Sequence, residues 1–198
     1  MQIVENYPKP VLDALMNHIG THDTVRAITA LAGESCAYRD RYWQSMQHLS
    51  EQQYRDGVHL LQTAATLQFT LPGVPSIYYG DEAGMQGYKD PFNRCFYPWG
   101  EENQTLLAHY RKLGKIRKEN SLFAEGRFEI LSSVAGCTAY SRSDDNEAIL
   151  VIANMNAHPI TYYMKNEWSN ARDLLGNAYV RNNLVDIGVK SAVILKRL

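Results

Sequence analysis

Two stretches of sequence decide the expected fold, Ile19-Gly-Thr-His-Asp-Thr-Val-Arg26 and Pro72-Gly-Val-Pro-Ser-Ile-Tyr-Tyr-Gly-Asp-Glu82. In each, a short apolar run ends abruptly in polar residues, which is how a buried parallel strand delivers side chains to the carboxyl-terminal edge of a barrel. The first stretch places an imidazole, a carboxylate and a guanidinium close together, on His22, Asp23 and Arg26. Three such groups at the end of a strand predict a binding or catalytic site.

Composition and charge exclude several classes of partner. The chain has 198 residues, is 45% hydrophobic and carries a formal net charge of -1, so it can bury a core and holds one domain with a smaller second one. Its one basic cluster, at 111–118, falls in the last turns of an expected helix, where cations complement the helix dipole, and we expect no nucleic-acid partner. No stretch approaches the ~20 apolar residues of a membrane span, and residues 1–8 lack the pattern of a signal peptide.

The cysteines predict neither a disulfide framework nor a zinc site. Cys36, Cys95 and Cys137 are widely spaced, with no Cys-x-x-Cys pair and no nearby histidine at ligand spacing. We therefore expect no metal and no cofactor in this segment. The same pattern favours a reducing, cytoplasmic compartment.

Helical periodicity dominates up to about residue 120. Tyr54, Val58, Leu61 and Ala65 recur at helical spacing, which predicts an amphipathic helix that ends before Pro72. A long rim loop or an irregular helix is expected at 34–51, and a second long loop at 81–99. Before His22 we expect a short strand, although the apolar spacing there fits a helix turn almost as well. The other expected elements are an extended lead-in over 6–12, a helix with Thr24 as candidate cap that stops at Gly33, a strand at 76–80, and a helix with Asn103 as candidate cap that closes near Asn120.

Beyond residue 121 the pattern changes to short β-rich runs separated by turn signals such as Ser143-Asp-Asp-Asn146. This pattern is typical of an antiparallel β-sandwich. We expect its strands at 127–131, 138–142, 148–153, 160–164 and 191–195.

On chemistry alone, each candidate site motif has an ordinary explanation as well. His22 and Asp23 could satisfy each other as a structural pair, and Asp81-Glu82 could be a solvated loop. The segment Asp90-Pro-Phe-Asn-Arg94 could be a turn closed by an ion pair. The many aromatic residues fit sugar binding and core packing about equally well.

A resemblance to a known family separates these readings. Gly20-Thr-His-Asp-Thr-Val-Arg26 resembles the fourth conserved motif of the α-amylase family, glycoside hydrolase family thirteen, and Gly73–Glu82 resembles its motif at the last barrel strand. Asp90–Arg94 and Phe96-Tyr-Pro-Trp99 follow as they do in neopullulanases, maltogenic amylases and cyclomaltodextrinases. The resemblance implies the C-terminal part of a (β/α)8 TIM barrel over 1–120, followed by an antiparallel β-sandwich domain over 121–198.

The resemblance also implies roles for individual residues in a retaining α-glucan hydrolase. Asp23 matches the carboxylate that holds sugar hydroxyls at the reacting ring and stabilises the transition state, and His22 matches the neighbouring histidine. Asp90 and Arg94 match the pair that binds the next sugar. The implied partners are α-glucan oligosaccharides.

The match is incomplete in one respect. Retaining hydrolysis needs a nucleophile and an acid about 5 Å apart, and in this family both belong to motifs that would precede Met1. Asp81 and Glu82 are not expected to replace them, so we expect this chain alone to be inactive. Two other classes stay open, a glucan-binding module and a catalytically silent barrel with a structural or interaction role.

Barrel strands without their neighbours also predict an association behaviour. Such strands would leave apolar faces and unpaired backbone groups in solvent. We therefore expect self-association through those edges.

Overall fold

The computed structural model describes residues 6–197. Residues 1–5 and 198 lie outside the described residues. They include most of the segment 1–8, on which the expected absence of a signal peptide rests, and the outer ends of the two predicted domains. The chain forms two compact units, one of residues 16–68 and 75–113, the other of residues 1–15, 69–74 and 114–198. The predicted division at 120/121 into barrel and sandwich stays a prediction.

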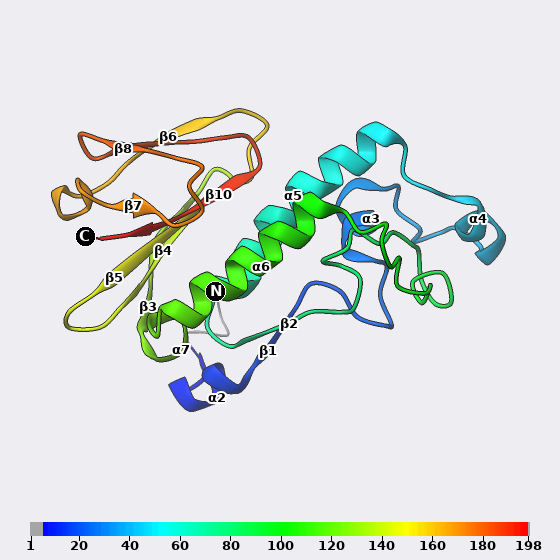
Figure 1. Ribbon diagram of the computed structural model, residues 1–198, viewed down its shortest axis with the longest axis horizontal. Coiled ribbons are helices and arrows are strands. Elements are labelled where there is room, and N and C mark those ends of the chain that lie inside the picture. The colour runs from blue at the N-terminus through cyan, green and yellow to red at the C-terminus, as the bar shows by residue number, and fades with distance from the viewer. Residues whose placement is uncertain (1–5, 198) are drawn as a thin grey trace. The chain divides into compact units, whose positions relative to one another are not determined.

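The first of these units is built on two long helices, α5 (Glu51–Thr70) and α6 (Gln104–Glu119), whose final residues belong to the other unit (Figure 1). Its hydrophobic cluster consists of Ala27, Ile28, Val58, Leu61 and Leu106. The helical periodicity of the sequence is thereby confirmed for both helices, since each contributes its apolar positions to one core. The cap of α6 is also as predicted, because the side-chain oxygen of Asn103 accepts from the Leu106 N–H at 3.0 Å.

Two shorter helices lie in the same unit, α3 (Ala27–Ala32) and α4 (Arg41–Met46). Helix α3 ends at Gly33 as predicted, but its N-cap is Arg26, so the expectation that Thr24 caps it is wrong. A Cβ on Gly57 would lie 2.7 Å from the Ile28 side chain, so the glycine lets α5 approach α3 closely.

Two short strands differ from expectation. They are β1 (Met16–His18) and β2 (Val74–Ser76), paired in a two-stranded sheet. The predicted strand at 76–80 is wrong because the chain turns after Ser76, with the Asp81 N–H donating to the Tyr78 carbonyl at 3.1 Å. Nor is β1 buried on both faces, since Met16 is 59% exposed. Because β1 and β2 pair only with each other among the described residues, the (β/α)8 barrel stays a prediction.

The second unit contains two antiparallel sheets and the helices α2 (Lys9–Ala14) and α7 (Leu122–Glu125). The predicted extended lead-in is partly wrong, because α2 forms there with Pro10 in its first turn, where no backbone donor is needed. The larger sheet has the order β3-β4-β5-β10-β7 (Figure 1). Its strands are β3 (Arg127–Val134), β4 (Cys137–Ser143), β5 (Ala148–Asn154), β10 (Ser191–Lys196) and β7 (Arg172–Asp173).

The smaller sheet has the order β6-β9-β8. Its strands are β6 (Ile160–Tyr163), β9 (Leu184–Ile187) and β8 (Val180–Arg181), and a 3-10 turn, η1 (Asn166–Trp168), follows β6. One hydrophobic cluster includes Leu150 and Val193 of the larger sheet together with Val185 and Ile187 of the smaller one. This arrangement is consistent with the predicted sandwich.

The five predicted strands are confirmed, and β7, β8 and β9 were missed. For β8 and β9 the sequence did hold a signal, the pair Asn182-Asn183 that connects them. Both residues have positive φ in the structure, 49° and 65°. Asparagine at both central positions is typical of a tight hairpin turn.

Asp173 on β7 organises the end of the larger sheet. Its carboxylate accepts from four backbone N–H groups, those of Leu175, Asn177, Ala178 and Ile194, at 2.7–3.1 Å. Asp173 is 6% exposed, so these donors have little access to water. The residue therefore stabilises a segment that has almost no regular ladder of its own.

We predict that Asp173→Ala lowers the free energy of unfolding of this unit by at least about 3 kcal/mol, because several buried donors lose their acceptor at once. Asp173→Asn, which keeps one acceptor oxygen, should cost less. Urea unfolding followed by circular dichroism measures both. A loss below about 1 kcal/mol for the alanine variant would show that water replaces the carboxylate.

Candidate functional site

His22 and Asp23 lie in a turn that follows β1. The turn is closed by two threonines: the Thr21 N–H donates to the Thr24 hydroxyl at 3.0 Å, and that hydroxyl donates back to the Thr21 carbonyl. His22 Nε2 and Asp23 Oδ2 are 3.3 Å apart, and their side chains are 60% and 77% exposed. Both groups are thus in contact with each other and available to a ligand.

Arg26 is fully buried beneath this turn. Its guanidinium carbon lies 4.2 Å from the ring centroid of Tyr78 and 4.6 Å from that of Tyr79. Nη1 donates to the Tyr79 carbonyl and lies 3.4 Å from Asp81 Oδ1. Two aromatic faces and a carboxylate therefore compensate the charge that burial removes from water.

Asp81 is as inaccessible as Arg26, with 1% exposure. Burial raises the pKa of this carboxyl to about 6, against the opposing effect of the Arg26 charge. A side chain on Gly20 would collide with the Asp81 carboxylate, so the glycine leaves space for it. The solvated-loop explanation is therefore wrong for Asp81, and this carboxyl is enclosed rather than presented to a substrate.

Glu82 has a local role at the same chain reversal. Its carboxylate accepts from the Gly80 N–H at 2.9 Å. Gly80 has φ of 85°, so the reversal needs a residue without a side chain at this position. Glu82 thus stabilises the turn that follows β2.

Asn93 joins the two candidate motifs. Its amide nitrogen donates to the carbonyls of His22 at 2.8 Å and Thr24 at 2.7 Å, and the residue is fully buried. The segment Asp90–Arg94 is thereby fixed beside the His22-Asp23 turn, although 67 residues separate Asp90 from Asp23 in sequence. The sequence analysis did not single out Asn93, because nothing in its local pattern distinguishes it from a turn residue.

Asp90 and Arg94 form the second exposed pair. Asp90 Oδ1 lies 2.6 Å from Arg94 Nε, with the Arg94 and Asp90 side chains 44% and 53% exposed. Arg41 donates to the Asp90 carbonyl at 2.9 Å, which ties this segment to α4. Among residues 6–197, the structure brings the two exposed pairs near each other through Asn93 and forms no hydrogen bond or ion pair between them.

The site offers two carboxylates, an imidazole and a guanidinium to solvent. Aromatic side chains lie in the same unit, and Tyr79 and Trp99 are 42% and 82% exposed. This combination can bond hydroxyl groups from several sides and stack on an apolar ring face. Over the described residues no three His, Cys, Asp or Glu side chains gather where a metal ion could bind. In the same range no helix has the length and hydrophobicity needed to cross a membrane.

We predict that the free energy of unfolding falls as pH rises from about 4 to about 6, because the folded state binds the Asp81 proton more tightly than the unfolded state does. The difference between about 3.8 and about 6 corresponds to about 3 kcal/mol, present below pH 4 and lost above pH 6. Asp81→Asn should remove this part of the slope. Urea unfolding at several pH values measures it, and equal slopes for the two proteins would contradict the assignment.

Comparison with known proteins places this geometry in context. No family model matches the chain. The chain is 41% identical over 142 residues to an amylopullulanase of Thermoanaerobacter thermohydrosulfuricus, covering 72% of this chain and 9% of that protein. It is 31% identical over 186 residues to a cyclomaltodextrinase of Thermoanaerobacter pseudethanolicus, covering 92% of this chain and 28% of the relative.

A solved structure agrees at the level of the fold. The debranching enzyme of Nostoc punctiforme superposes with a TM-score of 0.76 at 21% identity, covering 98% of this chain and 36% of that one. The chain thus spans between a tenth and about a third of the length of the relatives it matches. Together with the motifs at 20–26 and 73–82, these similarities show that the chain belongs to the α-amylase family, glycoside hydrolase family thirteen.

Proposed function

We propose that this chain forms the sugar-positioning part of a retaining α-glucan hydrolase that acts on starch-derived α-glucosidic bonds. The observation that carries the proposal is the Asn93 bridge, which holds Asp90 and Arg94 beside His22 and Asp23. Two exposed polar pairs at adjacent positions suit two successive sugar rings. The relatives named amylopullulanase and cyclomaltodextrinase support this substrate class.

In this proposal, Asp23 and His22 bond the hydroxyls of the reacting ring, and Asp90 and Arg94 bond the next ring. Contacts of the first kind tighten as the ring flattens toward an oxocarbenium-like transition state, so they accelerate the reaction. Contacts of the second kind hold the substrate equally before and during reaction. Residues up to about 120 then belong to the end of a (β/α)8 barrel, which would present all four side chains at the ends of its strands.

We predict that the 198-residue chain alone does not hydrolyse maltoheptaose, cyclodextrins or pullulan. Positioning groups cannot replace a nucleophile and an acid about 5 Å apart, and Asp81 is buried. The test is incubation of purified chain with each substrate and analysis of the products. Turnover that scales with protein and disappears in Asp23→Ala would contradict this. Affinity for the same sugars that depends on the exposed aromatic residues and not on Asp23 would favour a glucan-binding module instead.

We predict different kinetic effects at the two pairs when the chain is joined to segments that supply the nucleophile and acid. Asp23→Asn should lower kcat at least about 100-fold with a smaller change in KM, since its contacts strengthen in the transition state. Arg94→Ala should chiefly raise KM for longer substrates. Steady-state kinetics on maltooligosaccharides of increasing length separates the two, and equal small effects would refute the assignment.

We also propose that the isolated chain self-associates. Met16 and Ile77, on or beside the two-stranded sheet, are 59% and 43% exposed, and burying a large apolar side chain gains about 1.5–3 kcal/mol. Light scattering across a concentration series should detect dimers or larger species. Met16→Lys together with Ile77→Lys should restore the monomer, and a wild-type chain that is monomeric at all concentrations would rule the proposal out.

A further inference from the structure

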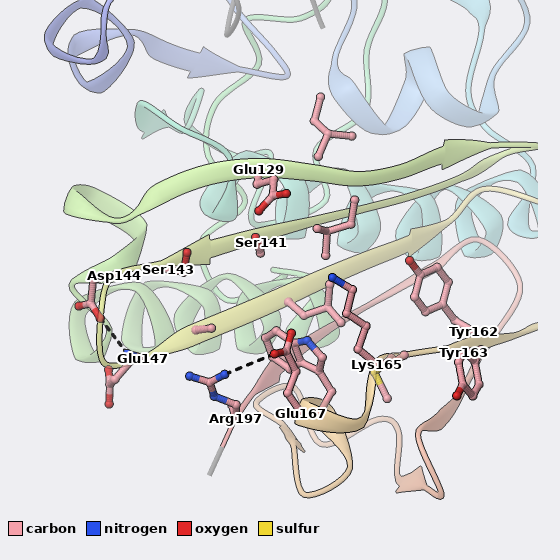
Figure 2. Close-up of a pocket in the computed structure, with 16 residues that line it drawn as sticks. Glu129, Ser141, Ser143, Asp144, Glu147, Tyr162, Tyr163, Lys165, Glu167 and Arg197 are labelled. Carbon is pink, nitrogen blue, oxygen red and sulfur yellow. Dashed lines mark hydrogen bonds and ion pairs between the residues drawn. The ribbon is translucent and has the colours of Figure 1, made fainter.

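A cleft in the two-sheet unit, remote in sequence from the motifs above, has the lining of a binding site. It has a volume of about 560 Å³, within the range of roughly 300–1,000 Å³ common for small-molecule sites. One wall is formed by β3, β4 and β5 of the larger sheet, and the other by residues 162–168 of the β6–η1 segment (Figure 2). All of its lining residues belong to one unit.

The sheet wall of the cleft is polar where a sandwich interior is ordinarily apolar. Glu129 pairs with Ser141 across β3 and β4, and Ser141 pairs with Leu150 across β4 and β5. Residues directly opposite each other share a face of the sheet, and Leu150 belongs to the hydrophobic cluster between the sheets. Glu129 and Ser141 are therefore on the inner face, which predicts a polar occupant beside them.

Ser141 makes the strongest case for an occupant. The residue is 7% exposed and lines the cleft, yet its hydroxyl forms no hydrogen bond within residues 6–197. A ligand in the cleft could therefore bond this hydroxyl in place of water.

Charges around the cleft mostly neutralise one another. Glu167 lies 4.0 Å from Arg197, and Glu147 lies 3.2 Å from Lys196. This leaves Glu129, Asp144 and Lys165 as lining residues without an ion-pair partner in the described chain. Figure 2 shows the Lys165 side chain reaching from the β6–η1 segment toward the strands of the larger sheet. Two unpaired anions and one unpaired cation disfavour an anionic ligand and suit a neutral one that both donates and accepts hydrogen bonds.

We propose that this cleft binds a short neutral oligosaccharide. Sugar hydroxyls donate to Glu129 and accept from Lys165 and Ser141, while the apolar face of a pyranose ring packs against Tyr162 and the edge of Trp168. An anionic ligand fits poorly, because four acidic side chains and two basic ones line the cleft. The choice of an α-glucan as the oligosaccharide rests on the proposed function; the cleft chemistry itself requires only a polyhydroxylated ring.

The test is titration of the ¹⁵N-labelled 198-residue chain with maltotriose, and separately with cellotriose and inorganic phosphate, monitored by NMR. The amide chemical shifts of residues 129–131, 141–143 and 162–168 should change with maltotriose and stay constant with phosphate. Glu129→Ala and Lys165→Met should each raise the dissociation constant fitted to these shifts about tenfold or more. Both residues are exposed, so the variants should fold. Glu125→Ala and Lys118→Met, exposed residues outside the cleft, are the matched controls.

Each outcome bears on one proposal or the other. Maltotriose shifts confined to 20–26 and 90–94 would overturn the cleft and leave the proposed function intact. Equal binding of cellotriose at the cleft would keep a sugar site there and remove its link to α-glucans. Loss of affinity in the controls as large as in the cleft variants, or no shifts at the cleft with either sugar, would overturn the inference.

Discussion

The burial of one guanidinium, that of Arg26, is the constraint on which the candidate site depends. An uncompensated charge in a protein interior costs several kcal/mol, so the chain must surround it with partners. Tyr78, Tyr79 and Asp81 supply them from the end of β2, 52 to 55 positions further along the sequence. The two stretches with which the sequence analysis began therefore meet because a charge on one needs the aromatic rings and the carboxylate of the other.

This arrangement separates the structural groups of the site from the groups that a substrate can reach. Arg26 and Asp81 are enclosed and hold the two turns together, whereas His22, Asp23, Asp90 and Arg94 face solvent. The division agrees with the chemistry of each environment. Burial keeps the pKa of Asp81 high and encloses the carboxyl, while the exposed pairs remain accessible from solvent.

Local patterns in the sequence were enough to predict the long helices and five of the strands beyond residue 121. The spacing of Val58 and Leu61 and the cap at Asn103 act within one turn of helix, so the sequence displays them directly. The buried Asp81 and the Asn93 bridge could not be predicted in this way. Their partners lie 55 and about 70 residues away, and a polar residue in a Gly-rich loop reads as solvated until the fold encloses it. The strand at 76–80 failed for a related reason, since Tyr78 and Tyr79 pack on Arg26 instead of continuing β2.

The two exposed pairs contribute little to the stability of the loops that carry them. An ion pair at the surface contributes about 0–1 kcal/mol, so neither His22–Asp23 nor Asp90–Arg94 accounts for the order of its loop. That order comes from hydrogen bonds: those of the threonine pair in the exposed turn, those of the buried Asn93, and that of the Gly87 carbonyl, which accepts from the Arg26 N–H at 2.9 Å. The fold thus fixes the backbone beneath each pair through hydrogen bonds to other residues and leaves the side chains above weakly held. A site organised in this way can bind hydroxyl groups with little cost of reorganisation, because the atoms that move on binding are not the atoms that stabilise the loops.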